Sequence, residues 1–152
     1  LPTLRAQRSG RILMVSSMAS TFSIPFQAFY SASKSALNDF AMALRNEVRP
    51  WGIGVACLLP GDVQTGFTAA RRKSTIGQDV YPAMTRSVAT MEHDENVGQD
   101  AERIARRLLR LATCRFLPVY NYEGWGYRLL AMLAKMLPAT LVNWAVGRLY
   151  RC

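Results

Sequence analysis

The feature that most constrains the fold is a short apolar run, a long amphipathic segment and a second short apolar run in succession. The first run, at residues 11–17 (RILMVSS), places four apolar residues in a row, and the second, at residues 53–59 (IGVACLL), has the same length. Short continuous apolar runs fit strands that are buried on both faces, as in a parallel sheet. Strand, helix and strand in this order form a βαβ unit, so the sequence predicts an α/β fold with a parallel sheet.

The segment between the two runs has the periodicity of a helix, which we expect from about residue 28 to residue 49. Pro50-Trp51-Gly52 follows it and is expected to stop the helix. The apolar residues of the segment recur at helical spacing, which places them on one face. These residues are Leu37, Phe40, Ala41, Leu44 and Val48.

The second half of the chain alternates polar stretches with amphipathic and apolar ones. Over residues 100–113, apolar side chains fall on one helical face and four arginines on the other. Residues 66–78 are polar, basic and irregular, as in a mobile loop. In chain order we expect this loop, a short helix at 81–91, a charged turn at 93–96, the helix at 100–113, a strand at 116–120, and two helices within 127–150 that are split at Pro138.

Composition and charge limit the classes of function. Half of the residues are hydrophobic and 19% are charged, which is ordinary for a globular protein. The net charge of +9 is spread along the chain without a recognised nucleic-acid-binding module, so we expect a solvated basic surface and no nucleic-acid partner. The three cysteines lack the spacing of a disulfide framework or a metal site, which favours a cytoplasmic protein without a bound metal. Among them, Cys57 lies in the second apolar run and is interpreted as a small core residue.

Tyr30 and Lys34 are four residues apart on the predicted helix, so their side chains share one face. Tyrosine is ordinarily a poor acid–base catalyst at neutral pH, and an ammonium group nearby stabilises the phenolate form. Ser17, at the end of the first predicted strand, can hydrogen-bond the same substrate oxygen. Taken alone, the pair has a second interpretation as an exposed tyrosine and lysine on a solvated helix face.

Three segments together resemble the second half of a classical short-chain dehydrogenase/reductase: GRILMVSS, the YSASK of Tyr30–Lys34, and the LLPGDVQTGF of Leu58–Phe67. The resemblance is close over Gly10–Thr65 and looser beyond. It implies a Rossmann-like, doubly wound parallel sheet that is incomplete, with residues 1–152 as the C-terminal portion of a single domain that lacks its N-terminal cofactor-binding βαβ units. It also implies an NAD(P)-dependent oxidoreductase that interconverts an alcohol and a ketone or aldehyde.

The resemblance assigns a catalytic role to each member of the trio. Tyr30 is the general acid during reduction and the general base during oxidation. Lys34 activates this tyrosine and hydrogen-bonds the nicotinamide ribose, so both residues also belong to the cofactor site. Ser17 orients the substrate and stabilises the developing oxyanion. Ser16 is the alternative serine, but Ser17 matches the position of the family.

The turn after the second apolar run would lie against the nicotinamide of NAD or NADP. Without the family, Pro60-Gly61 is a simple turn after a strand. With it, Pro60, Gly61, Val63 and Thr65 become cofactor-binding residues: the backbone of Val63 would meet the carboxamide, and Thr65 would reach the carboxamide or the pyrophosphate. Asp62 and Gln64 are interpreted as loop residues.

Several family motifs have no match in the chain. These are the glycine-rich cofactor loop, the residue that selects NAD or NADP, the Asn-Asn-Ala-Gly stretch and the catalytic asparagine. We expect all of them upstream of Leu1. Because phosphates bind at the N-terminus of the first helix in doubly wound folds, the 152-residue chain alone is expected to bind cofactor poorly and to be inactive.

The tail is apolar, and two interpretations of it stay open. Residues 129–147 contain one charge, Lys135, and one proline, Pro138, which both argue against a single spanning helix. The apolar helices expected over 126–152 either cover the substrate cleft or form the subunit interface of a homo-oligomer. Alternatively they make peripheral contact with a membrane, through aromatic residues near their ends and arginines beside them, which would suit a lipid-like substrate.

Two classes of function follow. The first is an oxidoreductase that acts on a small-molecule carbonyl or alcohol substrate, with residues 66–96 as its substrate loop or lid. The second is a non-catalytic protein of the same fold, or an inactive fragment, that binds a membrane or a partner through the basic surface and the apolar tail. The catalytic trio favours the first, in the cytoplasm or in association with a membrane.

Overall fold

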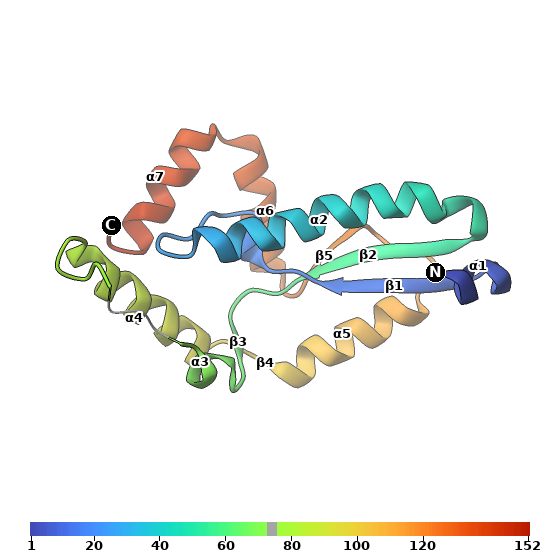
Figure 1. The fold of residues 1–152 in the computed structure, drawn as a ribbon, viewed down its shortest axis with the longest axis horizontal. Helices are drawn as coiled ribbons and strands as arrows, with labels where there is room; N and C mark the ends of the chain where they lie inside the picture. The colour runs from blue at the N-terminus through green and yellow to red at the C-terminus, as the bar shows by residue number, and fades with distance from the viewer. Residues whose placement is uncertain (73–75) are drawn as a thin grey trace.

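The computed structural model describes residues 1–72 and 76–152, and its centre is a parallel sheet of three strands (Figure 1). The strands are β1 (Gly10–Val15), β2 (Ile53–Leu59) and β5 (Tyr120–Tyr122). β2 lies between the other two, and both pairings are parallel. The predicted α/β fold with a parallel sheet is confirmed.

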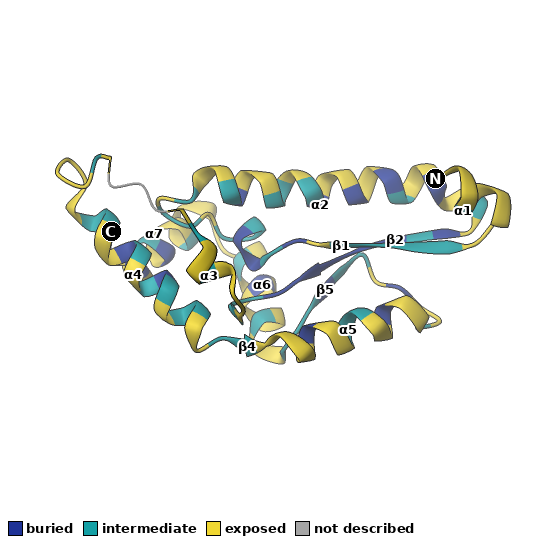
Figure 2. Ribbon diagram, turned by 60° about the horizontal axis from the view of Figure 1, so that its bottom comes forward, coloured by how far each residue is buried: buried dark blue, intermediate teal, exposed yellow. Residues whose placement is uncertain are grey.

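Helices cover both faces of this sheet, with α2 (Ala28–Val48) on one side and α5 (Ala101–Thr113) on the other (Figure 2). β2 supplies both layers of the core because successive residues of a strand point to opposite faces. Cys57 belongs to the cluster under α2, whereas its neighbour Leu58 belongs to the cluster with α5. Residues 55–59 are each at most 1% exposed, so β2 is buried on both faces.

The register of β2 is fixed on both sides. Gly10 pairs with Ile53 and Val15 with Leu58 on the β1 side, and Cys57 pairs with Tyr120 on the β5 side. Cys57 is fully buried, as predicted for a small core residue. This register brings the carboxyl ends of β1 and β2 to the same edge of the sheet.

α2 buries a face that is less apolar than its sequence indicates. Ala41, Leu44 and Val48 pack on the sheet as predicted, but Phe40 is 56% exposed, so its assignment to the inner stripe is wrong. Asn38 is buried there, and its Nδ2 donates a hydrogen bond to Ser20 Oγ at 2.7 Å. The buried face of the helix therefore includes a polar residue, Asn38, which binds the segment after β1. A pattern of apolar residues alone does not identify such a position.

Short elements join these layers. β3 (Val63–Gln64) and β4 (Gln99–Asp100) pair in parallel as a separate two-stranded sheet. Asp100 caps α5 by accepting a hydrogen bond from Glu102 N at 3.0 Å. Among the described residues, no helix is long and apolar enough to cross a membrane. The remaining elements are α1 (Pro2–Gln7), η1 (Met18–Ser20), η2 (Arg49–Trp51), α3 (Phe67–Ala70), α4 (Pro82–Asn96), α6 (Trp125–Met136) and α7 (Ala139–Leu149).

The region expected as a loop, a short helix and a charged turn is more helical than predicted. Within the expected loop 66–78, residues 67–70 form α3, and residues 73–75 lie outside the described part. The expected turn at 93–96 is wrong, because these residues form the last turn of α4. Arg71, at the end of α3, forms an ion pair at 2.5 Å with Glu95 on that turn. This contact between residues far apart in the sequence stabilises the last turn of α4.

The third strand is displaced from its predicted position at 116–120 to 120–122. Its central residue, Asn121, is buried, and its side-chain nitrogen donates to the carbonyl oxygens of Cys57 and Pro118 at 3.3 and 2.9 Å. The predicted position rested on apolar residues in the sequence, whereas the actual position of the strand is determined by its pairing with β2. The expected split of the tail at Pro138 is confirmed, since this residue lies between α6 and α7.

Candidate active site

A cavity of about 650 Å³ opens at the carboxyl ends of β1 and β2. Ligands of open α/β folds commonly bind at this edge of the sheet. All of the residues that the sequence assigns to catalysis or cofactor binding line this one cavity. They are Ser17, Tyr30, Lys34, Pro60, Gly61, Val63 and Thr65.

Two serines follow β1 and have different partners. The backbone N–H of Ser16 donates to Leu58 O at 2.8 Å, which extends the pairing with β2, and its buried Oγ donates to Lys34 O at 3.1 Å. Ser17 is extended, and its Oγ accepts a hydrogen bond from Ala19 N at 3.1 Å at the start of η1. Ser16 therefore holds the first strand against α2, while the Ser17 side chain lies at the cavity with its own proton available for donation.

Tyr30 and Lys34 lie one helical turn apart near the start of α2, and both are half-buried. The Lys34 ammonium lies 5.7 Å from the centre of the Tyr30 ring and donates a hydrogen bond to Val15 O at 3.0 Å. The contact with Val15 brings the ammonium to the end of β1, beside the two serines. Because an ammonium group has three donor hydrogens, Lys34 can bind a further acceptor in the cavity.

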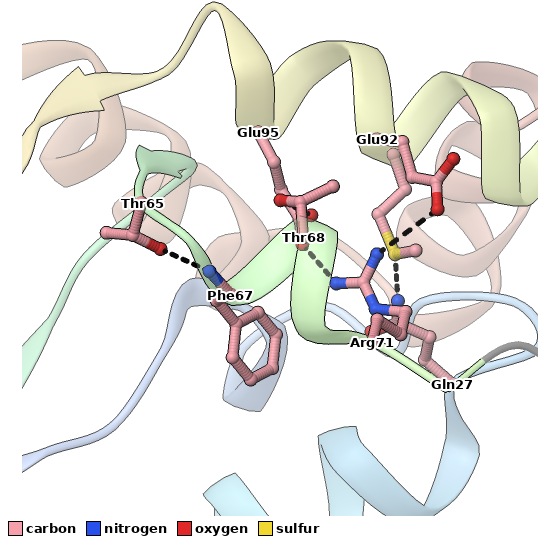
Figure 3. A network of polar contacts seen from close by, with 8 residues as sticks. Gln27, Thr65, Phe67, Thr68, Arg71, Glu92 and Glu95 are labelled. Carbon is pink, nitrogen blue, oxygen red and sulfur yellow. Dashed lines mark hydrogen bonds and ion pairs between the residues drawn. The ribbon is translucent and has the colours of Figure 1, made fainter.

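The turn after β2 closes the same edge of the cavity. Pro60 O accepts a hydrogen bond from Met18 N at 2.9 Å, so this turn is joined to η1. A Cβ on Gly61 would come within 2.0 Å of the Tyr127 ring, so only glycine allows α6 to approach so closely. Thr65 Oγ1 accepts a hydrogen bond from Phe67 N at 3.2 Å, at the beginning of α3 (Figure 3).

Most of the rest of the cavity wall is apolar and comes from segments that the sequence motifs do not include, although Gln27, Asp94 and Glu95 also line it. The apolar wall is formed by Phe22 and Ile24 after η1, by Met91 of α4, and by side chains of α6 and α7. The cavity therefore has a polar end, which holds the tyrosine, lysine and serine, and a larger apolar part.

The segment after the turn is held to α4 by polar contacts. Thr68 Oγ1 donates to Glu95 Oε2 at 2.6 Å, and Arg71 Nη2 donates to Glu95 Oε1 at 2.5 Å. Arg71 Nη1 also lies 4.0 Å from Glu92 Oε1, and Figure 3 shows the guanidinium reaching from α3 toward both glutamates. These contacts fix α3 beside the cavity, which Phe67 and Glu95 both line.

Comparison with known proteins decides the family. The family model described as short chain dehydrogenase matches residues 1–76, which is half of the chain and includes the trio and the turn. The chain belongs to the short-chain dehydrogenase family. The resemblance of its sequence motifs to this family is thereby confirmed.

Relatives within the short-chain dehydrogenase family match more of the chain. It is 31% identical to a 3-ketodihydrosphingosine reductase of Bacteroides thetaiotaomicron, over 99% of this chain and 57% of the relative. A dehydrogenase/reductase SDR family protein 7-like of Drosophila melanogaster is 45% identical over 72% of this chain and 31% of the relative. The chain thus spans less than two thirds of the length of either relative.

Solved structures of short-chain dehydrogenases share the fold. A short-chain dehydrogenase from Streptomyces avermitilis superposes with a TM-score of 0.68 at 23% identity, over 97% of this chain and 55% of that one. A short-chain dehydrogenase from Burkholderia cenocepacia, solved in complex with NADP, gives the same TM-score at 17% identity, over 95% and 50%. The partial coverage of both structures fits the incomplete doubly wound sheet expected from the sequence.

Two residues to which the sequence assigns no role in the site also line this cavity. Asp62, interpreted from the sequence as a loop residue, lines the cavity with Tyr127. Tyr127 OH donates to Asp62 Oδ2 and accepts from Asp62 N, both at 3.4 Å. Burial raises the pKa of Asp62, and the charges of Asp94 and Glu95 raise it further. No sequence pattern links these two residues, because they are 65 positions apart.

The raised pKa of Asp62 is expected to make the stability of the fold decrease as pH rises. The unfolded chain releases this proton near the ordinary value of 3.8, whereas the folded protein holds it to a higher pH, so ionisation across this interval favours unfolding. Asp62→Asn removes the titrating group and keeps an oxygen that accepts from Tyr127. We expect the variant to gain stability over the wild type as pH rises through the interval, measured by urea unfolding at several pH values. A stability difference that does not change with pH would contradict this cause.

Proposed function

We propose that the protein is an NAD(P)-dependent oxidoreductase that interconverts an alcohol and a ketone or aldehyde in this cavity. The observation that carries the proposal is that Ser17, Tyr30 and Lys34, from two different elements, line one cavity together with the turn after β2. The trio therefore meets the turn at a place where a carbonyl compound has room to bind.

Each member of the trio acts on the substrate oxygen or on a group beside it. Tyr30 donates its phenolic proton to that oxygen during reduction and takes the proton back during oxidation. The Lys34 ammonium lies 5.7 Å from the centre of the Tyr30 ring and interacts electrostatically with the negative charge that develops on the phenolic oxygen during proton transfer. Ser17 donates a hydrogen bond to the same oxygen and stabilises the negative charge that develops there.

The residues around the turn fit the nicotinamide end of NAD or NADP. Lys34 and Thr65 supply donors for the ribose and the carboxamide, Val63 supplies backbone groups, and Pro60 and Gly61 present a surface without long side chains. A nicotinamide bound there would supply the hydride. The chain's own residues orient the carbonyl and move the proton at its oxygen.

The apolar part of the cavity favours a substrate with a hydrocarbon portion. The trio lies at one end, whereas Met91 of α4 and the aliphatic side chains of α6 and α7 provide most of the remaining wall, to which α4 also contributes Asp94 and Glu95. An extended alkyl chain would replace water in this region while its carbonyl lies near Tyr30. The relative whose name describes it as a 3-ketodihydrosphingosine reductase supports a lipid-like ketone as the substrate class.

Catalytic efficiency is expected to rise with the length of an alkyl ketone. Burial of each methylene contributes about 0.8 kcal/mol, which corresponds to about a fourfold gain in kcat/KM until the apolar part of the cavity is filled. The measurement is the oxidation of NADH or NADPH by the full-length protein with a homologous series of ketones. Ketones of matched length with ether oxygens in the chain serve as the control, and equal kcat/KM across both series would refute the apolar substrate class.

Three further features belong to this proposal. Residues 66–96 act as the substrate loop or lid, and the contacts of Arg71 and Thr68 with Glu95 hold its described part in place. Residues 126–152 act as apolar helices that wall the cavity. The complete enzyme forms a homo-oligomer and works in the cytoplasm or at a membrane.

A further inference from the structure

The outer face of α6 carries a continuous apolar stripe. Trp125, Leu129, Met132 and Met136 follow one another at intervals of four, three and four residues, which places them on one face of the helix. All four are exposed, and the two at the ends, Trp125 and Met136, are 82% and 79% exposed. The opposite face holds the buried Ala131, so the stripe points away from the protein.

α7 has the same division into an inner and an outer face. Val146 and Tyr150 are buried in a cluster with Met91, whereas Leu141 and Trp144 lie exposed on the other side of the helix. Trp144 is 63% exposed. Figure 1 shows α6 and α7 joined at a turn that points away from the sheet, at the end of the molecule where α2 begins.

The charges beside these apolar residues are all of one sign. Residues 124–152 contain four basic residues and no acidic residue. The basic residues are Arg128, Lys135, Arg148 and Arg151, and all four are exposed, but the Lys135 ammonium lies over the ring of Tyr120 in β5, so the three arginines supply the outer charge. A surface of exposed tryptophan, aliphatic side chains and cations is complementary to anionic lipid headgroups above a hydrocarbon layer.

The inner faces of the same two helices line the proposed substrate cavity. Leu130 and Leu133 of α6 and Val142 and Ala145 of α7 are part of its wall. Leu130 and Leu133 are also exposed to solvent, so they connect the cavity wall with the outer surface. A surface applied to α6 and α7 would therefore lie next to the apolar part of the cavity.

We propose that α6 and α7 dock on the surface of an anionic lipid bilayer and that the apolar substrate reaches the cavity from that bilayer. The route for the substrate rests on the proposed function, whereas the docking surface does not. At a rise of 1.5 Å per residue each helix is less than about 20 Å long, so both lie along the interface and their outer side chains enter the lipid. A second copy of the chain fits this surface less well, because a symmetric contact would bring the basic residues of both copies together without acidic partners.

The three tryptophans allow a direct test in the full-length protein. Single-tryptophan variants that retain Trp51, Trp125 or Trp144 are mixed with phosphatidylcholine vesicles that carry brominated acyl chains, with and without phosphatidylserine. We expect several-fold stronger quenching of Trp125 and Trp144 than of Trp51, which lies beyond the other end of α2. The quenching should require phosphatidylserine and weaken with salt.

Charge variants refine the test. Arg128→Gln and Arg148→Gln are each expected to lower the vesicle partition coefficient about fivefold. Arg110→Gln, on the exposed face of α5, is the matched control and should leave it unchanged. Absence of quenching at Trp125 and Trp144, or equal quenching at all three tryptophans, would overturn the proposal.

Three outcomes separate this proposal from its alternatives. If Trp125→Ser with Met136→Ser converts an oligomer to a monomer in sedimentation and no quenching occurs, a second copy covers the stripe and the membrane proposal fails. Turnover of a short, water-soluble ketone without vesicles tests the proposed function separately. Turnover without vesicle binding would overturn only the proposed docking on a bilayer. Vesicle binding without turnover would overturn only the proposed oxidoreductase activity.

Discussion

Replacing Tyr30 with phenylalanine in the full-length protein is expected to lower kcat by about 10²- to 10⁴-fold. The substitution removes only the hydroxyl that would exchange a proton with the substrate, while the ring keeps its place beside Lys34 near the start of α2. The measurement is kcat at saturating ketone and cofactor. Binding of NADH or NADPH, followed by fluorescence titration, and the midpoint of thermal unfolding should both stay close to those of the wild type.

Tyr127→Phe is the matched control for this experiment. Tyr127 lines the same cavity, but its hydroxyl binds Asp62 and the backbone of the turn. We expect a much smaller loss of kcat from this variant. If Tyr30→Phe retained full turnover, Tyr30 would not be the proton donor. If the wild type itself showed no turnover while it kept its biological function, the non-catalytic alternative would replace the proposed enzyme.

Gly98→Ala is expected to destabilise the fold by about 1–3 kcal/mol and to weaken cofactor binding. A Cβ at this position would lie 2.5 Å from the carbonyl carbon and oxygen of Asp62 and 2.8 Å from Val63 N. These are backbone atoms of the turn, so they cannot move aside as a flexible side chain would. The adjacent Gln99 N donates to Asp62 O at 2.8 Å, and this bond and the pairing of β3 with β4 would be lost or stretched.

Two measurements check this prediction. Urea unfolding reports the free energy of unfolding, and the KM for NADH or NADPH reports the displacement of the turn that carries Val63 and Thr65. Gly147→Ala is the control, because a Cβ there meets nothing within 4 Å and alanine is favoured over glycine inside a helix. Equal stability of both variants would show that the contact between Gly98 and Asp62 does not constrain the turn.

The elements that could be predicted from the sequence are those whose signal is local. Residues 53–59 form a strand with the predicted boundaries, and the helix beginning at Ala28 extends nearly as far as expected. β5 was misplaced because its three residues are set by backbone pairing with β2 rather than by their own character. The final turn of α4 was missed because Arg71, more than twenty residues earlier, binds it.

The candidate site shows the same division. Residues in the motifs of β1, α2 and the turn after β2 could be selected from the sequence, and the structure brings them to one cavity. The apolar wall from α6 and α7 could not be selected from the sequence. An apolar tail has the same composition whether it covers a cleft, forms a subunit interface or contacts a membrane. Asp62 and Tyr127 meet only through the tertiary fold, at a position where Gly61 leaves room for the ring.

The position of β1 at the edge of the sheet affects how the protein behaves in solution. β1 pairs with β2 on one side, and among the described residues no strand pairs with its other side. None of its six residues is buried, in contrast to β2, where six of seven are. An uncovered edge offers a row of free backbone donors and acceptors to any extended chain nearby. Recovery of this domain as a monodisperse protein therefore depends on a further strand along β1, and material without one will tend to aggregate edge to edge.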